Sequence, residues 1–166
     1  MNKKQKLYVM IGIPGSGKST YAKNNLPDTK YVSRDEIRFS LLKEGEPYFS
    51  KEKEAFNKFV QQINQYLKNG YDVVADATHL NYKSRGKLFS HLIFNRDKVK
   101  VIAIYMKTPL SICLNHNKTR LNTKTYVPEK IIIDMQKSLV VPNFIECNSV
   151  FDEIRTIINT EEKEKI

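Results

Sequence analysis

The amino-acid sequence predicts an α/β fold with three layers, in which about five parallel strands lie between helices on both faces. Apolar strand-like runs alternate with helix-like segments about five times along the 166 residues. Such βα repeats favour right-handed crossovers and therefore a parallel sheet. The second observation is a glycine-rich segment, GIPGSGKS at 12–19, between the first strand and the first helix. A chain of this length suits one domain with a sizeable core, here residues 1–166.

The first two strand–helix pairs are marked by apolar runs and by a helix-capping pattern. Residues 7–11 form the first predicted strand, and residues 18–25 the first helix. Residues 30–33 predict the second strand. Ser33 and Glu36 have the S-x-x-E spacing of a capping box, which predicts the start of the second helix.

The middle of the chain predicts a long helix followed by two more strands and another helix. Residues 51–68 form an amphipathic helix, because one face of a 3.6-residue period collects Phe56, Val60, Ile63 and Leu67. Residues 71–75 predict the third strand and residues 83–94 a helix. Residues 99–106 are an unbroken apolar run, which is typical of a strand buried on both faces.

The last third of the chain predicts two helices around a polar segment, and then a final strand and helix. One helix is expected from Pro109 and another from Pro128. The polar residues 115–126 between them are expected to form a loop or a flexible helical hairpin. Residues 145–147 predict a short last strand, and residues 151–158 a last helix.

The glycine-rich segment fits the phosphate-binding pattern GxxxxGK[ST]. Glycines let backbone N–H groups turn toward phosphate oxygens, the lysine reaches the β and γ phosphates, and the serine hydroxyl can bind Mg²⁺. The segment therefore predicts a nucleoside triphosphate site at a helix N-terminus. The alternative is a glycine-rich turn that binds no ligand. The residues predicted to hold the nucleotide are Gly12, Pro14, Gly15, Ser16, Gly17, Lys18, Ser19 and Thr20.

Asp35 and Arg38 supply acceptor chemistry just after the second predicted strand. They lie three residues apart on a helix and therefore share a face. A carboxylate near the γ phosphate can orient an acceptor hydroxyl and accept its proton, and an arginine one turn on can hold an anionic group. The helix dipole would stabilise the carboxylate, so Asp35 would chiefly position the hydroxyl. The alternative is a structural pair between the two side chains.

Polar side chains also follow the third predicted strand. Asp76 ends this strand, where P-loop proteins often place an acid that organises Mg²⁺, so Ser19 and Asp76 are the candidate metal ligands. Thr78 and Asn81 follow in a turn that could hydrogen-bond a substrate. The alternative is that these polar residues only satisfy a strand-to-helix turn. No apolar run ends in adjacent acids, which favours a small kinase over a motor or processive ATPase.

The segment 115–126 contains three cations and no acid. A mobile basic segment beside a triphosphate site could act as a lid, with an arginine neutralising transition-state charge. Arg120 is preferred over Lys118 and Lys124, because its planar guanidinium can bind two phosphate oxygens at once. The alternative is a solvated basic loop. His116 is expected to be a surface or packing residue, because no second His or Cys stands at metal-ligand spacing.

The composition bears on partners and on compartment. Lysine and arginine number 28 against 18 acids, and this net charge of +10 favours polyanionic partners; a solvated surface that aids solubility is the alternative. Cys113 and Cys147 lack metal-ligand spacing and are expected to be reduced. No apolar run approaches the roughly 20 residues of a membrane span, and no signal-peptide core is present, so a cytoplasmic protein is expected. Residues 160–166 are expected to fray.

Together these motifs resemble the kinase domain of phage 5′-polynucleotide kinases, in the adenylate-kinase-like branch of P-loop kinases. The similarity runs from about Tyr8 to Leu139. The stretches that carry it are GIPGSGKST, SRDEIR at 33–38, DATHLN at 76–81 with Arg85 after it, the basic segment ending at Arg120, and VPEKIIIDM. The chain departs from the family early in the lid, where related kinases usually have an arginine and this chain has His116.

The resemblance implies transfer of the γ phosphate of ATP, with Mg²⁺, to a 5′-hydroxyl end of DNA or RNA in nucleic-acid repair. Lys18 and Ser19 would then bind phosphates and metal. Asp35 would be the general base, Arg38 would grip the acceptor phosphate next to the 5′ end, and Arg120 would bind the donor phosphates. The residues expected to bind the acceptor are Asp35, Arg38, Asp76, Thr78, Asn81 and Arg85.

Two other functions remain open. One is a kinase of the same fold that acts on a small hydroxyl metabolite, a nucleotide sugar or an aminoacyl-tRNA. The other is an NTP-binding nucleic-acid adaptor that transfers nothing. The positive charge favours a strand with successive phosphates over a neutral metabolite.

Overall fold

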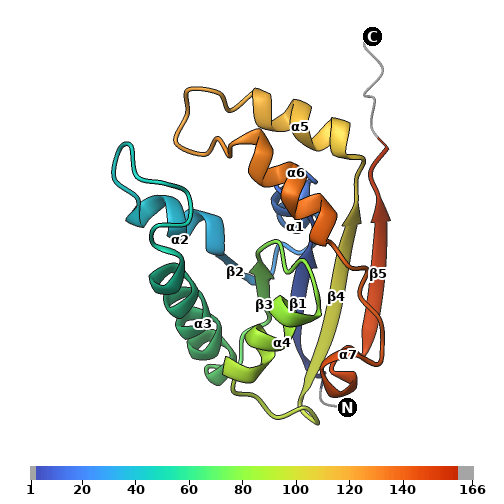
Figure 1. Ribbon diagram of the computed structural model, residues 1–166. Coiled ribbons are helices and arrows are strands. Elements are labelled where there is room, and N and C mark those ends of the chain that lie inside the picture. Colours follow the sequence, from blue (N-terminus) through green and yellow to red (C-terminus); the bar gives the residue numbers. More distant parts are fainter. Residues whose placement is uncertain (1–2, 161–166) are drawn as a thin grey trace.

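The computed structural model describes residues 3–160, which form a five-stranded sheet with all strands parallel (Figure 1). The strands are β1 (Gln5–Ile11), β2 (Lys30–Ser33), β3 (Val73–Asp76), β4 (Val99–Lys107) and β5 (Glu153–Ile158). Their order across the sheet is β2-β3-β1-β4-β5. β1 is therefore the central strand, with Leu7 opposite both Val73 of β3 and Val101 of β4.

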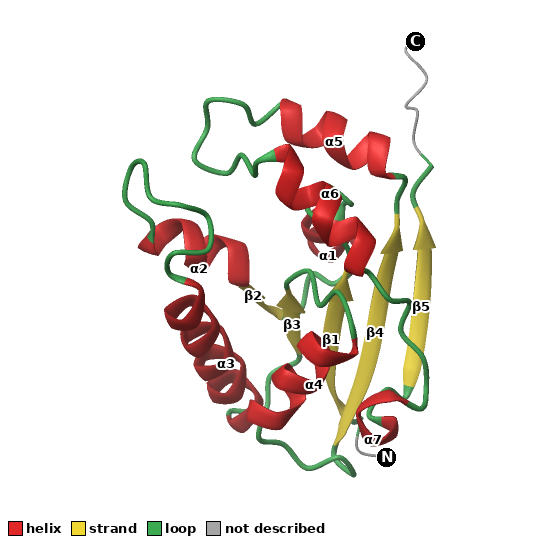
Figure 2. Cartoon of the chain, in the orientation of Figure 1, coloured by secondary structure: helices red, strands yellow, loops and turns green. Residues whose placement is uncertain are grey.

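Helices cover both faces of this sheet, which confirms the predicted three-layer α/β fold (Figure 2). The helices are α1 (Lys18–Asn25), α2 (Arg34–Leu41), α3 (Glu52–Lys68), α4 (Tyr82–His91), α5 (Leu110–Lys118), α6 (Glu129–Ser138) and α7 (Glu146–Ser149). Ala22 of α1 packs on one face of the sheet, and Phe59 of α3 and Leu88 of α4 pack on the other. Full burial of a large apolar side chain such as Phe59 or Leu88 contributes about 1.5–3 kcal/mol to stability.

Local signals in the sequence explain where several helices begin. The Ser33 Oγ accepts a hydrogen bond from the backbone N–H of Glu36 at 3.2 Å, so the predicted cap of α2 is present. Pro109 and Pro128 directly precede α5 and α6. A proline suits this position because its fixed φ favours the turn and its missing N–H would lack a helical partner.

Two predictions at the end of the chain are wrong. Residues 151–158 contain the strand β5 rather than a helix, and residues 145–147 enter the short turn α7 rather than a strand. β5 pairs along its length with β4. Ile154 packs in the core on one face of the sheet and Ile157 in the core on the other face, as the alternation of side chains along a strand requires. The preceding turn leaves helical geometry at three successive residues with positive φ, which are Cys147, Asn148 and Ser149.

Smaller differences concern boundaries. The helix predicted at 83–94 ends at His91, and the third strand begins at Val73 rather than at residue 71. Residues 161–166 of the segment expected to fray lie outside the described residues. Between residues 3 and 160, no helix combines the length and the apolar character that a membrane crossing needs.

Candidate active site

The glycine-rich segment forms a tight loop between β1 and α1, at the carboxyl end of the central strand. Gly15 and Gly17 have φ values of +83° and +96°, in the left-handed region that favours glycine. A Cβ at Gly15 would lie 2.5 Å from the carbonyl oxygen of Cys113, so the loop packs directly on the backbone of α5. Lys18 is buried and donates from Nζ to the carbonyl oxygen of Ile13 at 3.1 Å, which folds its side chain back over the loop.

Three features of this loop fit a bound phosphate. The Ser16 Oγ is buried without a hydrogen-bond partner among residues 3–160, although buried polar atoms are normally paired. A Cβ at Gly12 would lie 2.5 Å from that oxygen, so glycine keeps this space open. Gly17 precedes α1 without a side-chain cap, which leaves the first helical N–H groups to bind an anion. The loop is therefore suited to the predicted triphosphate.

A cavity of about 970 Å³ opens over the loop. This volume lies at the upper end of the range for small-molecule sites, roughly 300–1,000 Å³, so it can take a nucleotide and part of a second substrate. The predicted site residues that line it are Pro14, Gly15, Gly17, Lys18, Ser19, Thr20, Asp35, Asp76 and Arg120. The structure thus brings the phosphate loop, two carboxylates and the lid arginine together.

Asp76 lies at the inner wall of the cavity, at the end of β3, and is 6% exposed. The Tyr31 hydroxyl donates a hydrogen bond to Asp76 Oδ2. Burial raises the pKa of the Asp76 carboxyl, and the positive charge of Lys18 opposes this effect. Burial and then the nearby Asp76 charge raise the pKa of the Tyr31 hydroxyl, which keeps it protonated as a donor. The hydroxyl of Ser19 and the carboxylate of Asp76 are hard oxygen donors of the kind that Mg²⁺ prefers.

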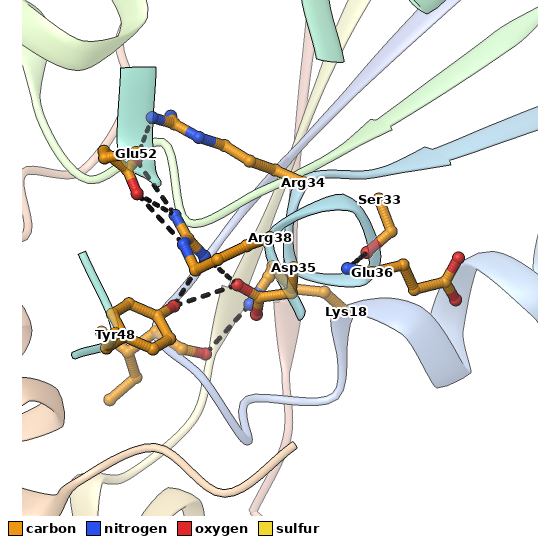
Figure 3. Close-up of polar contacts among 9 residues, drawn as sticks. Lys18, Ser33, Arg34, Asp35, Glu36, Arg38, Tyr48 and Glu52 are labelled. Atoms are coloured by element: carbon orange, nitrogen blue, oxygen red, sulfur yellow. Dashed lines mark hydrogen bonds and ion pairs between the residues drawn. The ribbon is translucent and has the colours of Figure 1, made fainter. Parts of the chain in front are cut away.

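Asp35 and Arg38 share one face of α2, as the spacing predicts, and form an ion pair (Figure 3). The Asp35 Oδ1 accepts hydrogen bonds from the guanidinium of Arg38 and from the Tyr48 hydroxyl, the latter at 3.0 Å. Within residues 3–160 no hydrogen bond engages Asp35 Oδ2, and the side chain is 38% exposed. Asp35 therefore has one oxygen fixed by protein and one that an acceptor hydroxyl can reach.

Arg38 is held by a second carboxylate that the sequence did not reveal. Its Nε and Nη2 donate to Glu52 Oε2 at 3.0 and 2.8 Å, and Glu52 also pairs with Arg34. The guanidinium carbon lies 4.4 Å from the centroid of the Tyr48 ring. Arg38 is only 5% exposed and is not among the residues that line the cavity. An anionic acceptor group would reach it only by displacing or sharing Glu52.

Three other residues predicted to bind the acceptor instead support the turn after β3. The Thr78 carbonyl accepts from the backbone N–H of Gly12 at 3.0 Å, and the Asn81 side chain caps α4. Arg85 is fully buried and pairs with Glu146 through Nε and Nη2. None of the three lines the cavity. The structure therefore does not bring Thr78, Asn81 and Arg85 into contact with this space.

The lid segment forms a closed loop beyond α5. Asn117 is fully buried; its Nδ2 donates to the carbonyl oxygen of Val127 at 2.6 Å, and its Oδ1 accepts from the Val127 N–H at 3.0 Å. Arg120 lies in the loop that this pair closes, and it lines the cavity. His116 also lines the cavity, and its Nδ1 donates to the Gly15 carbonyl at 2.8 Å. His116 thus joins the lid helix to the phosphate loop, a specific contact within the expected range of a surface or packing residue.

His79 is a buried neutral base behind the phosphate loop. It is 4% exposed and has a φ of 44°, and its Nδ1 donates to the carbonyl oxygen of Met10 at 2.6 Å. Burial lowers the pKa of the imidazole to about 3, and the hydrogen bond to Met10 only partly opposes this effect. Between about pH 3 and pH 6.5, the folded protein therefore keeps His79 uncharged, whereas the unfolded chain would protonate it.

A pH-dependent loss of stability is expected from His79. Below about pH 6.5 only the unfolded chain takes up this proton, so the contribution of His79 is complete above that pH and falls as the pH drops toward 3. Between pH 7 and pH 5 the wild-type free energy of unfolding should fall by about 2 kcal/mol more than that of His79→Gln. Urea unfolding at the two pH values measures this difference, with His91→Gln at an exposed histidine as control. Equal pH dependence in wild type and His79→Gln would contradict the assignment.

Comparison with known families gives a domain match, and the similar proteins include two from viruses. The family AAA_33, described as an AAA domain, matches residues 7–142. A protein of Autographa californica nuclear polyhedrosis virus, named as a bifunctional polynucleotide kinase/RNA ligase, is 29% identical over 84% of this chain and 22% of its own length. A protein of Acanthamoeba polyphaga mimivirus, named as a bifunctional polynucleotide phosphatase/kinase, is 28% identical over 93% of this chain and 34% of its own length. The chain thus spans about a fifth to a third of these curated relatives.

Solved structures match the fold at lower identity. A chain of the Pnkp1/Rnl/Hen1 RNA repair complex superposes with a TM-score of 0.68 and 21% identity over 84% of this chain and 45% of that chain. A fungal RNA kinase gives 0.67 and 17% over 98% and 40%, and a sugar kinase from Janibacter sp. HTCC2649 gives 0.62 and 15% over 95% and 86%. At these identities the likeness concerns the fold alone. The domain match, the viral relatives and the parallel sheet agree with the resemblance found in the motifs: the chain belongs to the AAA_33 family of AAA domains and has the α/β fold of P-loop kinases.

Proposed function

We propose that this chain is an ATP-dependent kinase that transfers the γ phosphate to a 5′-hydroxyl end of DNA or RNA. The observation that carries the proposal is one cavity lined by Lys18, by Asp35 and by Arg120, which supply a donor side, an acceptor side and a lid. The two viral relatives are named for polynucleotide kinase activity, which supports the same reaction. Because this chain covers only part of those relatives, the proposal concerns the kinase step alone.

The transfer forms a bond between the acceptor oxygen and the γ phosphorus and breaks the bond from that phosphorus to the β–γ bridging oxygen, so ADP leaves. Asp35 Oδ2 would orient the hydroxyl and take its proton. Arg38 and Tyr48 hold the other carboxylate oxygen, which fixes the direction of the side chain. Lys18 and Arg120 would stabilise the negative charge on the phosphate oxygens. Such electrostatic stabilisation, together with positioning, supplies most of the catalysis of phosphoryl transfer.

The donor side would use ATP and Mg²⁺. Ser19 and Asp76 would hold the metal ion, which when bound neutralises charge on the β and γ phosphates. Among residues 3–160 no group of three His, Cys, Asp or Glu side chains could form a protein cage for a metal. Phosphate and water oxygens would therefore complete the coordination, as is usual for Mg²⁺ in kinases.

The two candidate acceptors, a nucleic-acid strand and a small molecule, would make different contacts on the acceptor side of the site. Arg38 would hold the phosphate that follows the 5′ nucleotide once that phosphate exchanges with Glu52, and the net charge of +10 favours a polyanion. A small hydroxyl metabolite is the second candidate, because Glu52 and Asp35 already neutralise Arg38 and leave a site that also suits an uncharged acceptor.

One labelling assay tests the proposal. The protein is incubated with γ-labelled ATP, Mg²⁺ and a 5′-hydroxyl oligonucleotide, and label is expected on the strand. The same oligonucleotide carrying a 5′ phosphate serves as control and should stay unlabelled. Label on a sugar or nucleoside but on no DNA or RNA end would support the metabolite kinase instead. Release of labelled phosphate without any labelled acceptor would support the adaptor.

A further inference from the structure

We infer that an aromatic cluster beside Asp35 is the stacking platform for the acceptor strand, and that Phe49 receives the base that follows the 5′-terminal nucleotide. The cluster consists of Phe39 on α2 and of Tyr48 and Phe49 in the loop between α2 and α3. The inference rests on the proposed function, because it adds a second subsite to the acceptor side of the same cavity.

The three rings form a continuous path from the cavity to the surface. Phe39 lines the cavity together with Asp35. The centroids of Phe39 and Tyr48 lie 6.1 Å apart, and those of Tyr48 and Phe49 lie 4.7 Å apart at an interplanar angle of 84°. Tyr48 is 7% exposed and Phe49 is 50% exposed. The path therefore begins at a cavity wall and ends at an open ring held by a buried one.

The buried ring is also tied to the proposed reaction centre. The Tyr48 hydroxyl donates to Asp35 Oδ1 at 3.0 Å, and Arg38 stacks on the face of Tyr48 (Figure 3). Phe49 is thus separated from the group that would position the 5′ hydroxyl by one side chain. A nucleic-acid strand whose first hydroxyl meets Asp35 would continue toward the surface, where Phe49 offers an exposed aromatic ring next to Tyr48.

The loop after α5 supplies positive charge to the cavity. The loop after α5 contributes Arg120 and Thr125 to the cavity and also carries Lys118 and Lys124. Both this loop and the α2–α3 loop extend from the end of the molecule where the strands have their carboxyl ends (Figure 1). Sites for single strands combine cations that follow the backbone with aromatic rings on which bases stack. These two loops provide one element each.

Two other exposed apolar side chains, Tyr71 and Ile145, lack such a connection. Tyr71, which is 47% exposed, lies just before β3 at the amino ends of the strands. Ile145, which is 83% exposed, lies at the start of α7. Neither residue lines the cavity. Neither is linked to Asp35 by a described aromatic contact, as Phe49 is through Tyr48. Tyr71 is therefore a matched control for Phe49.

The first experiment reads stacking directly. The chain has no tryptophan, so Phe49→Trp introduces a single indole as a fluorescent probe. The tryptophan is excited selectively, and its emission is measured while a 5′-hydroxyl oligodeoxyadenylate is added without ATP. The emission is expected to be quenched by the oligonucleotide but not by deoxyadenosine 3′-monophosphate, which lacks a second base. Tyr71→Trp should show no such difference.

The second experiment measures the contribution of the ring to turnover. Phe49→Ala should raise the KM for the oligodeoxyadenylate about tenfold, as expected for loss of one base–aromatic stack. The KM for ATP and for deoxyadenosine 3′-monophosphate should stay within about twofold, and Phe49→Tyr should restore the oligonucleotide KM. Tyr71→Ala should leave all three values unchanged.

Three results would overturn the inference. An unchanged ratio of oligonucleotide to mononucleotide KM in Phe49→Ala would remove Phe49 from the acceptor path. Equal quenching of the indoles at positions 49 and 71 would show non-specific association. A change of oligomeric state in Phe49→Ala, measured by sedimentation velocity, would assign the ring to a contact between two copies of the chain. If wild type phosphorylates no acceptor at all, the proposed function fails, while the fluorescence titration still decides whether strands stack at Phe49.

Discussion

Asp35→Asn is expected to lower kcat for phosphate transfer by about 10²- to 10⁴-fold and to leave the affinity for ATP nearly unchanged. Asparagine keeps an Oδ1 that can accept from the Tyr48 hydroxyl, so the surrounding contacts can persist. It places an amide where Oδ2 would orient the acceptor hydroxyl, and it cannot take the proton. Steady-state kinetics with a 5′-hydroxyl oligonucleotide and equilibrium titration with ATP separate the two effects.

Two variants define the meaning of that result. Lys18→Met should weaken nucleotide binding as well as transfer, because Lys18 belongs to the phosphate loop. Glu54→Gln removes an exposed acid of α3 that pairs with Lys58 at 3.8 Å, and it should leave both quantities unchanged. Full transfer activity in Asp35→Asn would exclude Asp35 from the reaction.

Arg120→Ala should lower kcat by about 10²- to 10³-fold. The guanidinium lines the cavity from the lid loop, where it can approach the donor phosphates with two N–H groups at once. The substitution would remove the positive group that stabilises negative charge on the phosphate oxygens during transfer. The loss should appear chiefly in kcat, with a smaller effect on the KM for ATP, and single-turnover measurements would show it in the chemical step.

Lys118→Ala is the matched control for the lid. Lys118 is a cation two residues away in the same segment, but it is 65% exposed, lies 4.0 Å from Glu129 and does not line the cavity. Its removal should change kcat by less than about twofold. A similar loss in both variants would mean that the lid acts through general positive charge rather than through Arg120.

The phosphate loop of the candidate site could be predicted because its sequence pattern is local. The phosphate loop is specified by eight successive residues, and the boundaries predicted for α1 and β2 agree with the structure. The acceptor side depends on contacts that no local pattern contains. Glu52 meets Arg38 across the α2–α3 loop, and Glu146 meets Arg85 from 61 positions away. The sequence therefore indicated both arginines but not Glu52 and Glu146, which pair with them.

The end of the chain was misread because its apolar residues satisfy two periods. Phe151, Ile154 and Ile158 have helical spacing, which is compatible with the helix predicted at 151–158. The same segment contains the β-branched residues Ile154, Thr156, Ile157 and Ile158, which favour a strand. Because β5 was not predicted, Asn159, which follows the strand and lines the cavity, was not predicted as a site residue either. Composition was the better guide here, because pairing with β4 decides the structure.

The position of β1 in the sheet has a consequence for the way the chain is made. Among the five described strands β1 is synthesised first, yet the two strands that pair with it begin only at Val73 and Val99. Strands so distant in sequence close large loops before they gain contacts, which slows folding. A nascent chain thus carries the phosphate-loop residues long before the strand that presents them has both neighbours. We therefore expect a nucleotide to stabilise the domain only after β3 and β4 have paired with β1.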